Sequence, residues 1–143
     1  MNKSFEKTRP VGVTALSIFF MVATAIAFVA STSLLFPNGF LEPLWRLNPR
    51  GRAGLGGIGV WAVVLFFFVG SACAIAAVGL WRGARWGYVV GIIVLSINLL
   101  GDVVNVVFGT EPRAAIGILI IIVILVYLMS QRVKGFFRGS SEV

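Results

Sequence analysis

Four long apolar runs dominate the sequence and leave few folds open to it. They cover residues 11–36, 58–81, 86–108 and 113–131. Each run is close to the ~20 residues that a helix needs to cross the hydrocarbon of a bilayer. Hydrophobic residues make up 59% of the chain and charged residues only 12%, so a water-soluble core of this size could not hide the apolar side chains. We therefore expect an all-α membrane protein, a single domain over residues 1–143 built as a bundle of four transmembrane helices.

The connection between the first two runs predicts a short helix that lies in the membrane interface. In residues 40–49 the apolar side chains recur at helical spacing, while Glu42 and Arg46 fall off that face. We expect Pro49 to end this helix, because proline lacks the backbone donor that a helix interior requires. The functional alternative is that this loop forms a lid or a recognition surface.

A glycine-rich stretch at residues 54–59 matches G-x-G-x-x-G, the pattern of dinucleotide-binding loops. That function needs a preceding strand and an acidic residue about 20 positions further on. Here the stretch leads into an apolar run that contains no acid. The sequence therefore argues against nucleotide binding, and we expect the glycines to give a flexible re-entry into the membrane.

Small residues recur on one face of the second and third runs. Gly70 and Ala74 share a face of the second run, and Gly83, Gly87 and Gly91 recur at every fourth position into the third. Small side chains let two helix backbones approach closely in a membrane. We expect these faces to pack on neighbouring helices, within a homo-oligomer or a larger membrane complex.

The basic residues outside the runs predict the orientation of the chain. Lysine and arginine are enriched in cytoplasmic loops, so the side that carries more of them is expected to be the cytoplasmic one. This places both termini in the cytoplasm of a multi-pass protein of the cell inner membrane. Eight basic residues fall on that side, Lys3, Lys7, Arg9, Arg82, Arg85, Arg132, Lys134 and Arg138, and four on the other, Arg46, Arg50, Arg52 and Arg113.

Tryptophans near the ends of the runs fit this orientation. Trp45 and Trp61 would belong to the outer aromatic belt, and Trp81 and Trp86 to the inner one. The net charge of +7 is then explained by contact with anionic lipid headgroups. We expect lipids as partners of the basic residues, and no nucleic acid.

Asp102 is the one charged residue well inside an apolar run, and Asn98 and Asn105 share its helical face. Counted back from Phe108 at ~1.5 Å per residue, Asp102 lies about 9 Å and Asn98 about 15 Å inside the span. A carboxylate at such a depth costs on the order of 2–3 kcal/mol unless it faces the bundle or a water-filled cavity. Arg113 is the nearest candidate partner, because a short turn brings the fourth run beside the end of the third.

Three interpretations of this polar cluster stay open. In the first, Asp102 titrates or binds a cation in a small transporter or channel, with the asparagines as uncharged ligands. In the second, Asp102, the asparagines and Arg113 form a network that locks the third helix to the fourth or to a partner. In the third, the helix ends near Gly101 and the residues that follow lie in the interface.

The residue inventory weighs against catalysis. The chain has no histidine and a single cysteine, Cys73, so intrachain disulfides, thiolate metal clusters and histidine-ligated haem are not expected. No pattern places a nucleophile beside a base. We therefore expect no catalytic residue, no metal and no cofactor, and a non-enzymatic protein.

The sequence also resembles a group of uncharacterised small bacterial integral membrane proteins with four spans. The resemblance is carried by RPVGVTALSI (9–18), GLWRGARWGYVV (79–90) and YLMSQRVKGFF (127–137). It implies four spans and a bacterial inner membrane. The packing faces, and not the resemblance, lead us to expect an accessory or structural subunit, with a proton- or cation-linked transporter centred on Asp102 as the alternative.

Overall fold

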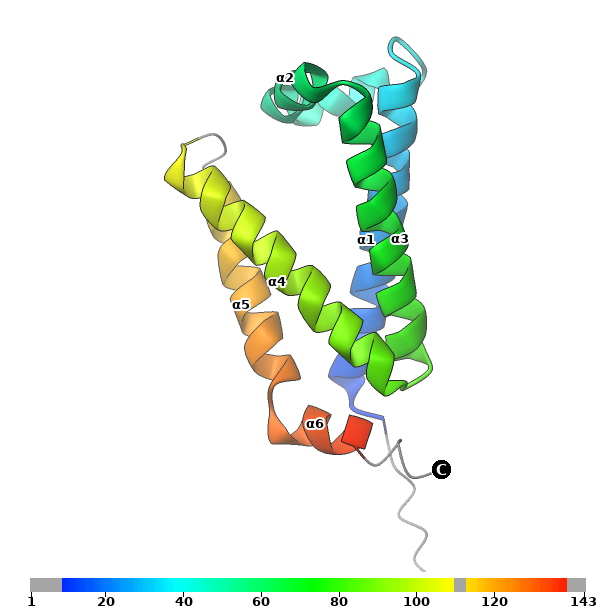
Figure 1. The fold of residues 1–143 in the computed structure, drawn as a ribbon, viewed down its shortest axis with the longest axis vertical. Helices are drawn as coiled ribbons and strands as arrows, with labels where there is room; N and C mark the ends of the chain where they lie inside the picture. Colours follow the sequence, from blue (N-terminus) through cyan, green and yellow to red (C-terminus); the bar gives the residue numbers. More distant parts are fainter. Residues whose placement is uncertain (1–8, 110–112, 139–143) are drawn as a thin grey trace, which may run out of the picture.

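The computed structural model describes residues 9–109 and 113–138, and every regular element within these ranges is a helix (Figure 1). Three helices, α1, α3 and α4, are long and apolar enough to cross a membrane, and α5 with α6 makes a fourth if this pair, bent by 55°, is one span. The elements are α1 (Val11–Leu35), the 3₁₀ helix η1 (Glu42–Leu47), α2 (Pro49–Ile58), α3 (Val60–Trp81), α4 (Arg85–Val107), α5 (Ala114–Leu128) and α6 (Gln131–Arg138).

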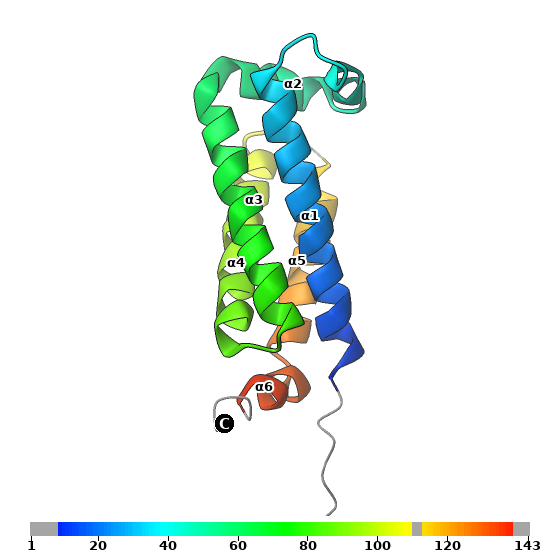
Figure 2. The same ribbon diagram turned by 90° about the vertical axis from the view of Figure 1, so that its right-hand side faces the viewer.

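Helices α1 and α3 form an antiparallel pair that stays in contact along its length (Figures 1 and 2). Small residues make this possible, because a Cβ built on Gly70 would lie 3.3 Å from the Cβ of Ala27. Further along the pair, the Ser31 hydroxyl donates a hydrogen bond of 3.2 Å to the carbonyl of Val63. The packing face expected at Gly70 is therefore occupied by α1 of the same chain.

Helices α3 and α4 cross where two glycines bring their backbones into contact. A Cβ on Gly87 would collide with the backbone of Gly79, and one on Gly79 would collide with Gly87. Gly83, in the turn between the helices, has a φ of +67°, which favours glycine. One turn further along α4, a Cβ on Gly91 would lie 3.5 Å from the ring of Phe20 in α1. Two members of the expected ladder, Gly87 and Gly91, are therefore packed against helices of the same chain.

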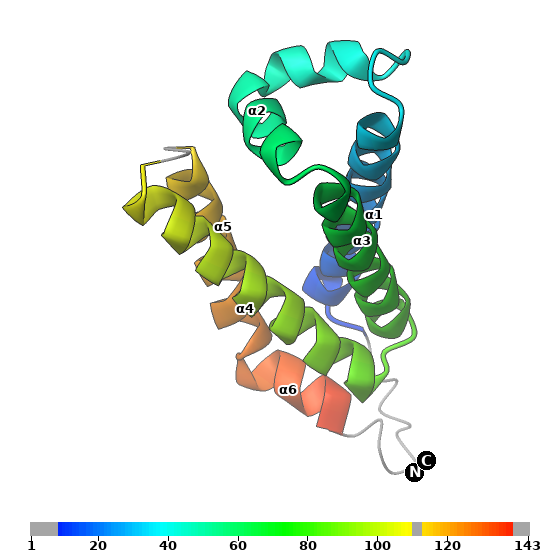
Figure 3. The same cartoon turned by 45° about the horizontal axis from the view of Figure 1, so that its top comes forward.

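The α4–α5 hairpin and the α1–α3 pair lie close together at the end where α6 lies, and they diverge toward the opposite end, where η1 and α2 lie (Figures 1 and 3). The buried residues of α4 are Gly87, Gly91, Val94 and Leu95, all in its first half. In residues 96–107, which we call the far half of α4, only Leu99 and Asp102 are half-buried and the rest are exposed. The described chain thus leaves most of this helical surface without a covering element.

At the opposite end, α6 turns back under the bundle. Its Val133 and Phe137 are buried, and the ring of Phe137 lies 5.0 Å from that of Tyr88 in α4. The Tyr88 hydroxyl donates to the carbonyl of Leu128 at the end of α5 at 3.0 Å, which satisfies a backbone acceptor that the helix end leaves free. Helix α6 therefore closes this end by apolar contact with α4.

The residues that precede α1 are tied to the end of α3. Nη2 of Arg9 donates a hydrogen bond of 2.7 Å to the carbonyl of Leu80, and its guanidinium lies 5.1 Å from the centre of the Trp81 ring. A cation beside the last carbonyls of a helix is favoured by the helix dipole. This bond joins the start of α1 to the turn between α3 and α4.

The loop between α1 and α3 differs from the expectation in one respect. A helical turn, η1, does lie within residues 40–49, but Pro49 begins a second helix instead of ending the first. The side chain of Asn48 caps that helix by accepting from the Gly51 N–H at 2.9 Å, and Pro49 occupies the first turn, where no backbone donor is needed. The glycine-rich stretch is consequently helical up to Ile58, and the break falls at Gly59, whose φ is +55°.

Candidate functional site

The polar residues predicted to share a face do lie on one continuous helix. Asn98, Asp102 and Asn105 all belong to α4, which runs on to Val107. The interpretation in which the helix ends near Gly101 is therefore wrong, because the backbone hydrogen bonding continues for almost two further turns. All three side chains lie in the far half of α4.

The carboxylate of Asp102 is directed at helix α5. A Cβ built on Gly117 would lie 2.6 Å from Oδ2 of Asp102, so a side chain at this position would displace the carboxylate from where it lies. Gly117 is the single glycine of α5, and that isolated small residue in a run of isoleucine, leucine and valine was the sequence signal for it. Within residues 9–109 and 113–138, the carboxylate forms neither a hydrogen bond nor an ion pair.

Arg113 does not form the ion pair that the sequence suggested. It lies at the N-terminal end of α5 and is exposed, and among the described residues the ion pair is between Arg52 and Glu42. Helix α5 does lie beside α4, as expected, but the residue that faces Asp102 is Gly117, one helical turn further along α5 than Arg113.

Asn98 and Asn105 lie on the exposed surface of the far half of α4. The side chain of Asn98 has no hydrogen-bond partner in the part of the chain that the structure describes. Gly101, between them in sequence, is also exposed, and a Cβ added to it would meet nothing within 4 Å. An amide in hydrocarbon without a partner costs free energy, so this surface is suited to contact with something outside the described chain.

The candidate site lies within the part of the chain that matches a protein-family model. Residues 53–131, more than half of the chain, match the model of the family DUF2127, described as "predicted membrane protein". The chain belongs to the DUF2127 family. No curated protein and no solved structure matches it. The DUF2127 match includes α3, α4 and α5, and with them the whole polar cluster.

The remaining predicted residues lie mostly within the DUF2127 match as well. Trp61 and Trp81 occupy the first and last turns of α3, and Trp86 the first turn of α4, so they mark opposite ends of the helices. Ala74 is half-buried in α3. Trp45, outside the match, is half-buried, and its indole N–H donates to the Ser33 hydroxyl at 2.9 Å, which anchors η1 on α1.

Metal-binding chemistry finds no support in the described residues, which contain no group of three or more histidine, cysteine, aspartate or glutamate side chains suited to a metal ion. Cys73 is free and buried in α3 among apolar neighbours. The candidate site consists of the carboxylate of Asp102 and the amides of Asn98 and Asn105 on one face of α4, with Gly117 of α5 opposite the carboxylate.

Proposed function

We propose that this member of the DUF2127 family is a non-enzymatic membrane protein that acts by helix packing, as an accessory or structural subunit of a homo-oligomer or of a larger membrane complex. It has four spans, with α5 and the turn into α6 as the fourth, and both termini on the cytoplasmic side of a bacterial inner membrane. Helices η1 and α2 lie in the opposite interface. The observation that carries the proposal is the exposed side chain of Asn98 on the far half of α4, which has no hydrogen-bond partner among the residues that the structure describes.

A second helix can form hydrogen bonds with the amide of Asn98, which lipid acyl chains cannot do. Acyl chains offer no hydrogen bond to an amide, whereas a helix that packs at Gly101 would bring its own polar groups within reach of Asn98. The amide both donates and accepts. Two copies of α4 related by a two-fold axis therefore satisfy each other, which makes a second copy of this chain the simplest partner.

The test is native mass spectrometry of the protein extracted from its own membrane in a mild detergent. We expect the chain to be recovered as an oligomer or with defined other subunits, and Asn98→Leu to lower the assembled fraction about three- to tenfold, the effect of one or two interhelical hydrogen bonds. Ser96→Leu, on the opposite side of α4, is the matched control and should leave assembly unchanged. A monodisperse monomer that is never recovered with another chain would contradict the proposal.

One observation supports a second candidate function, a small proton- or cation-linked transporter or channel. The Asp102 carboxylate lies between α4 and α5 without an ion-pair partner in the described residues. Intramembrane carboxylates in such settings commonly serve ion pathways.

On this second function, Asp102→Asn removes the charge while keeping the side-chain shape, so flux in liposomes should fall to the level of protein-free vesicles. The melting temperature of the variant, measured in parallel, should stay unchanged. If flux persists while the melting temperature falls, the carboxylate is a structural element of the α4–α5 hairpin. A wild-type protein that carries no flux in proton or cation assays removes this candidate.

A further inference from the structure

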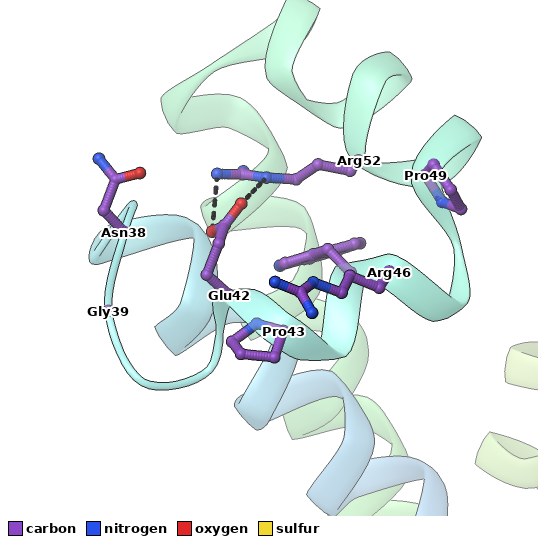
Figure 4. Close-up of a pocket in the computed structure, with 8 residues that line it drawn as sticks. Asn38, Gly39, Glu42, Pro43, Arg46, Pro49 and Arg52 are labelled. Atoms are coloured by element: carbon purple, nitrogen blue, oxygen red, sulfur yellow. Dashed lines mark hydrogen bonds and ion pairs between the residues drawn. The ribbon is translucent and has the colours of Figure 1, made fainter.

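The loop of η1 and α2 forms a pocket of about 750 Å³ that carries net positive charge (Figure 4). Arg52 donates to both carboxylate oxygens of Glu42, at 3.3 and 3.2 Å, so this acid is already neutralised by one arginine. Arg46 lines the same pocket and is exposed, and it has no ion-pair partner among the residues described. Figure 4 shows both guanidinium groups extending toward Glu42. Among the described residues, the pocket therefore keeps one cation without an ion-pair partner, Arg46, for an anionic group.

An apolar groove of about 420 Å³ runs beside this pocket, between α1 and η1. Its α1 wall includes Ala25, Ile26 and Val29, and its η1 wall includes Leu44 and Leu47.

Trp45 lines both the pocket and the groove, so the two meet at its indole. The position of that ring is fixed by its hydrogen bond to Ser33. From Ser33 to Ala25 the groove follows about 12 Å of helix, most of the depth of one leaflet, which is half of the ~30 Å hydrocarbon core. A polar, positively charged pocket thus continues into the apolar groove, which follows α1.

We propose that this site binds one phospholipid with an anionic headgroup. The headgroup phosphate accepts hydrogen bonds from Arg46 in the pocket, and one acyl chain lies in the groove along α1. The chemistry on the two sides of Trp45 matches the two ends of such a molecule, because arginine binds phosphate oxygens by charge-assisted hydrogen bonds and the groove is lined mainly by apolar side chains. The site is independent of the packing surface on α4.

The experiment is native mass spectrometry of the purified full chain with added phosphatidylglycerol or phosphatidylcholine. We expect one phosphatidylglycerol molecule to be retained in preference to phosphatidylcholine. Arg46→Gln should lower its retention about three- to tenfold, as expected for the loss of one partly exposed charged contact. Arg132→Gln, an exposed arginine in α6 at the other end of the bundle, makes the same change in charge and should leave retention unchanged.

A second variant tests the groove. Ala25→Trp places an indole in the apolar groove without altering the core, since Ala25 is exposed. It should weaken phosphatidylglycerol binding, whereas Leu119→Trp on the exposed face of α5 should not. Soluble glycerol phosphate should compete poorly, which distinguishes a lipid site from a free-phosphate site. Equal retention of the two lipids, or wild-type retention by both Arg46→Gln and Ala25→Trp, would overturn the proposal.

Discussion

Replacing Gly87 by valine should lower the free energy of unfolding by about 3 kcal/mol. The new side chain would collide with backbone atoms of Gly79 and lie 2.6 Å from the backbone nitrogen of Leu80. Backbone atoms cannot rotate aside as a flexible side chain can, so α4 has to move away from α3. The measurement is thermal unfolding in detergent followed by circular dichroism.

The chain offers a matched control for this prediction in another helix. Gly54→Val makes the same chemical change in α2, with a similar gain in helix propensity, but a Cβ there meets nothing within 4 Å. It should change the melting temperature little. If the two variants unfold alike, the α3–α4 crossing is not what holds this part of the bundle together.

Replacing Phe137 by alanine should release α6 from the bundle. Phe137 is 2% exposed and its ring lies 5.0 Å from that of Tyr88, and removing a buried phenylalanine side chain costs about 3 kcal/mol. An eight-residue helix without that contact is too short to persist alone. Trypsin should then cleave after Lys134 at least about tenfold faster, because cleavage follows the population of the opened segment.

Phe40→Ala provides the comparison, since the same side chain is removed where it is 90% exposed. It should leave the trypsin cleavage rate at Lys134 unchanged. Equal rates in Phe137→Ala and wild type would mean that contacts other than the Phe137 ring hold α6 in place.

The long helices could be predicted from the sequence because each is encoded by a long stretch of apolar residues. A run of apolar residues about 20 long admits few structures other than a helix in lipid, and α1, α3 and α4 follow the predicted runs within a few residues. The fourth run is less simple, because the helix bends by 55° between α5 and α6. Val133 and Phe137 are an i, i+4 pair on one face of α6, but their spacing alone does not show that this helix turns back under α4.

The packing partners could not be predicted in the same way. The recurrence of Gly87 and Gly91 identifies a flat face, but spacing does not say which helix approaches it, and the answer was Gly79 and Phe20 of the same chain. The contact of Asp102 could not be predicted from the sequence either. Its depth called for a charged neighbour, and Arg113 was close in sequence, whereas the contact that formed depends on the register between α4 and α5 and brings Gly117 opposite.

The prediction that Pro49 ends a helix was wrong because proline has opposite effects at different helix positions. It disrupts a helix interior and is favoured in a first turn, and the choice here depends on Asn48, which caps the following helix. Neither the pocket at Arg46 nor the groove along α1 was visible in the sequence, since each is formed by residues of η1 folded against other elements.

The bond between Arg9 and Leu80 constrains the order of events during synthesis. The two residues are 71 positions apart, so the carbonyl that Arg9 binds does not exist as a helix end until α3 has left the ribosome. Until then the start of α1 has neither that acceptor nor the Trp81 ring beside it. The start of α1 is therefore secured only after α3 has been made, and the second long apolar helix of the chain fastens the first.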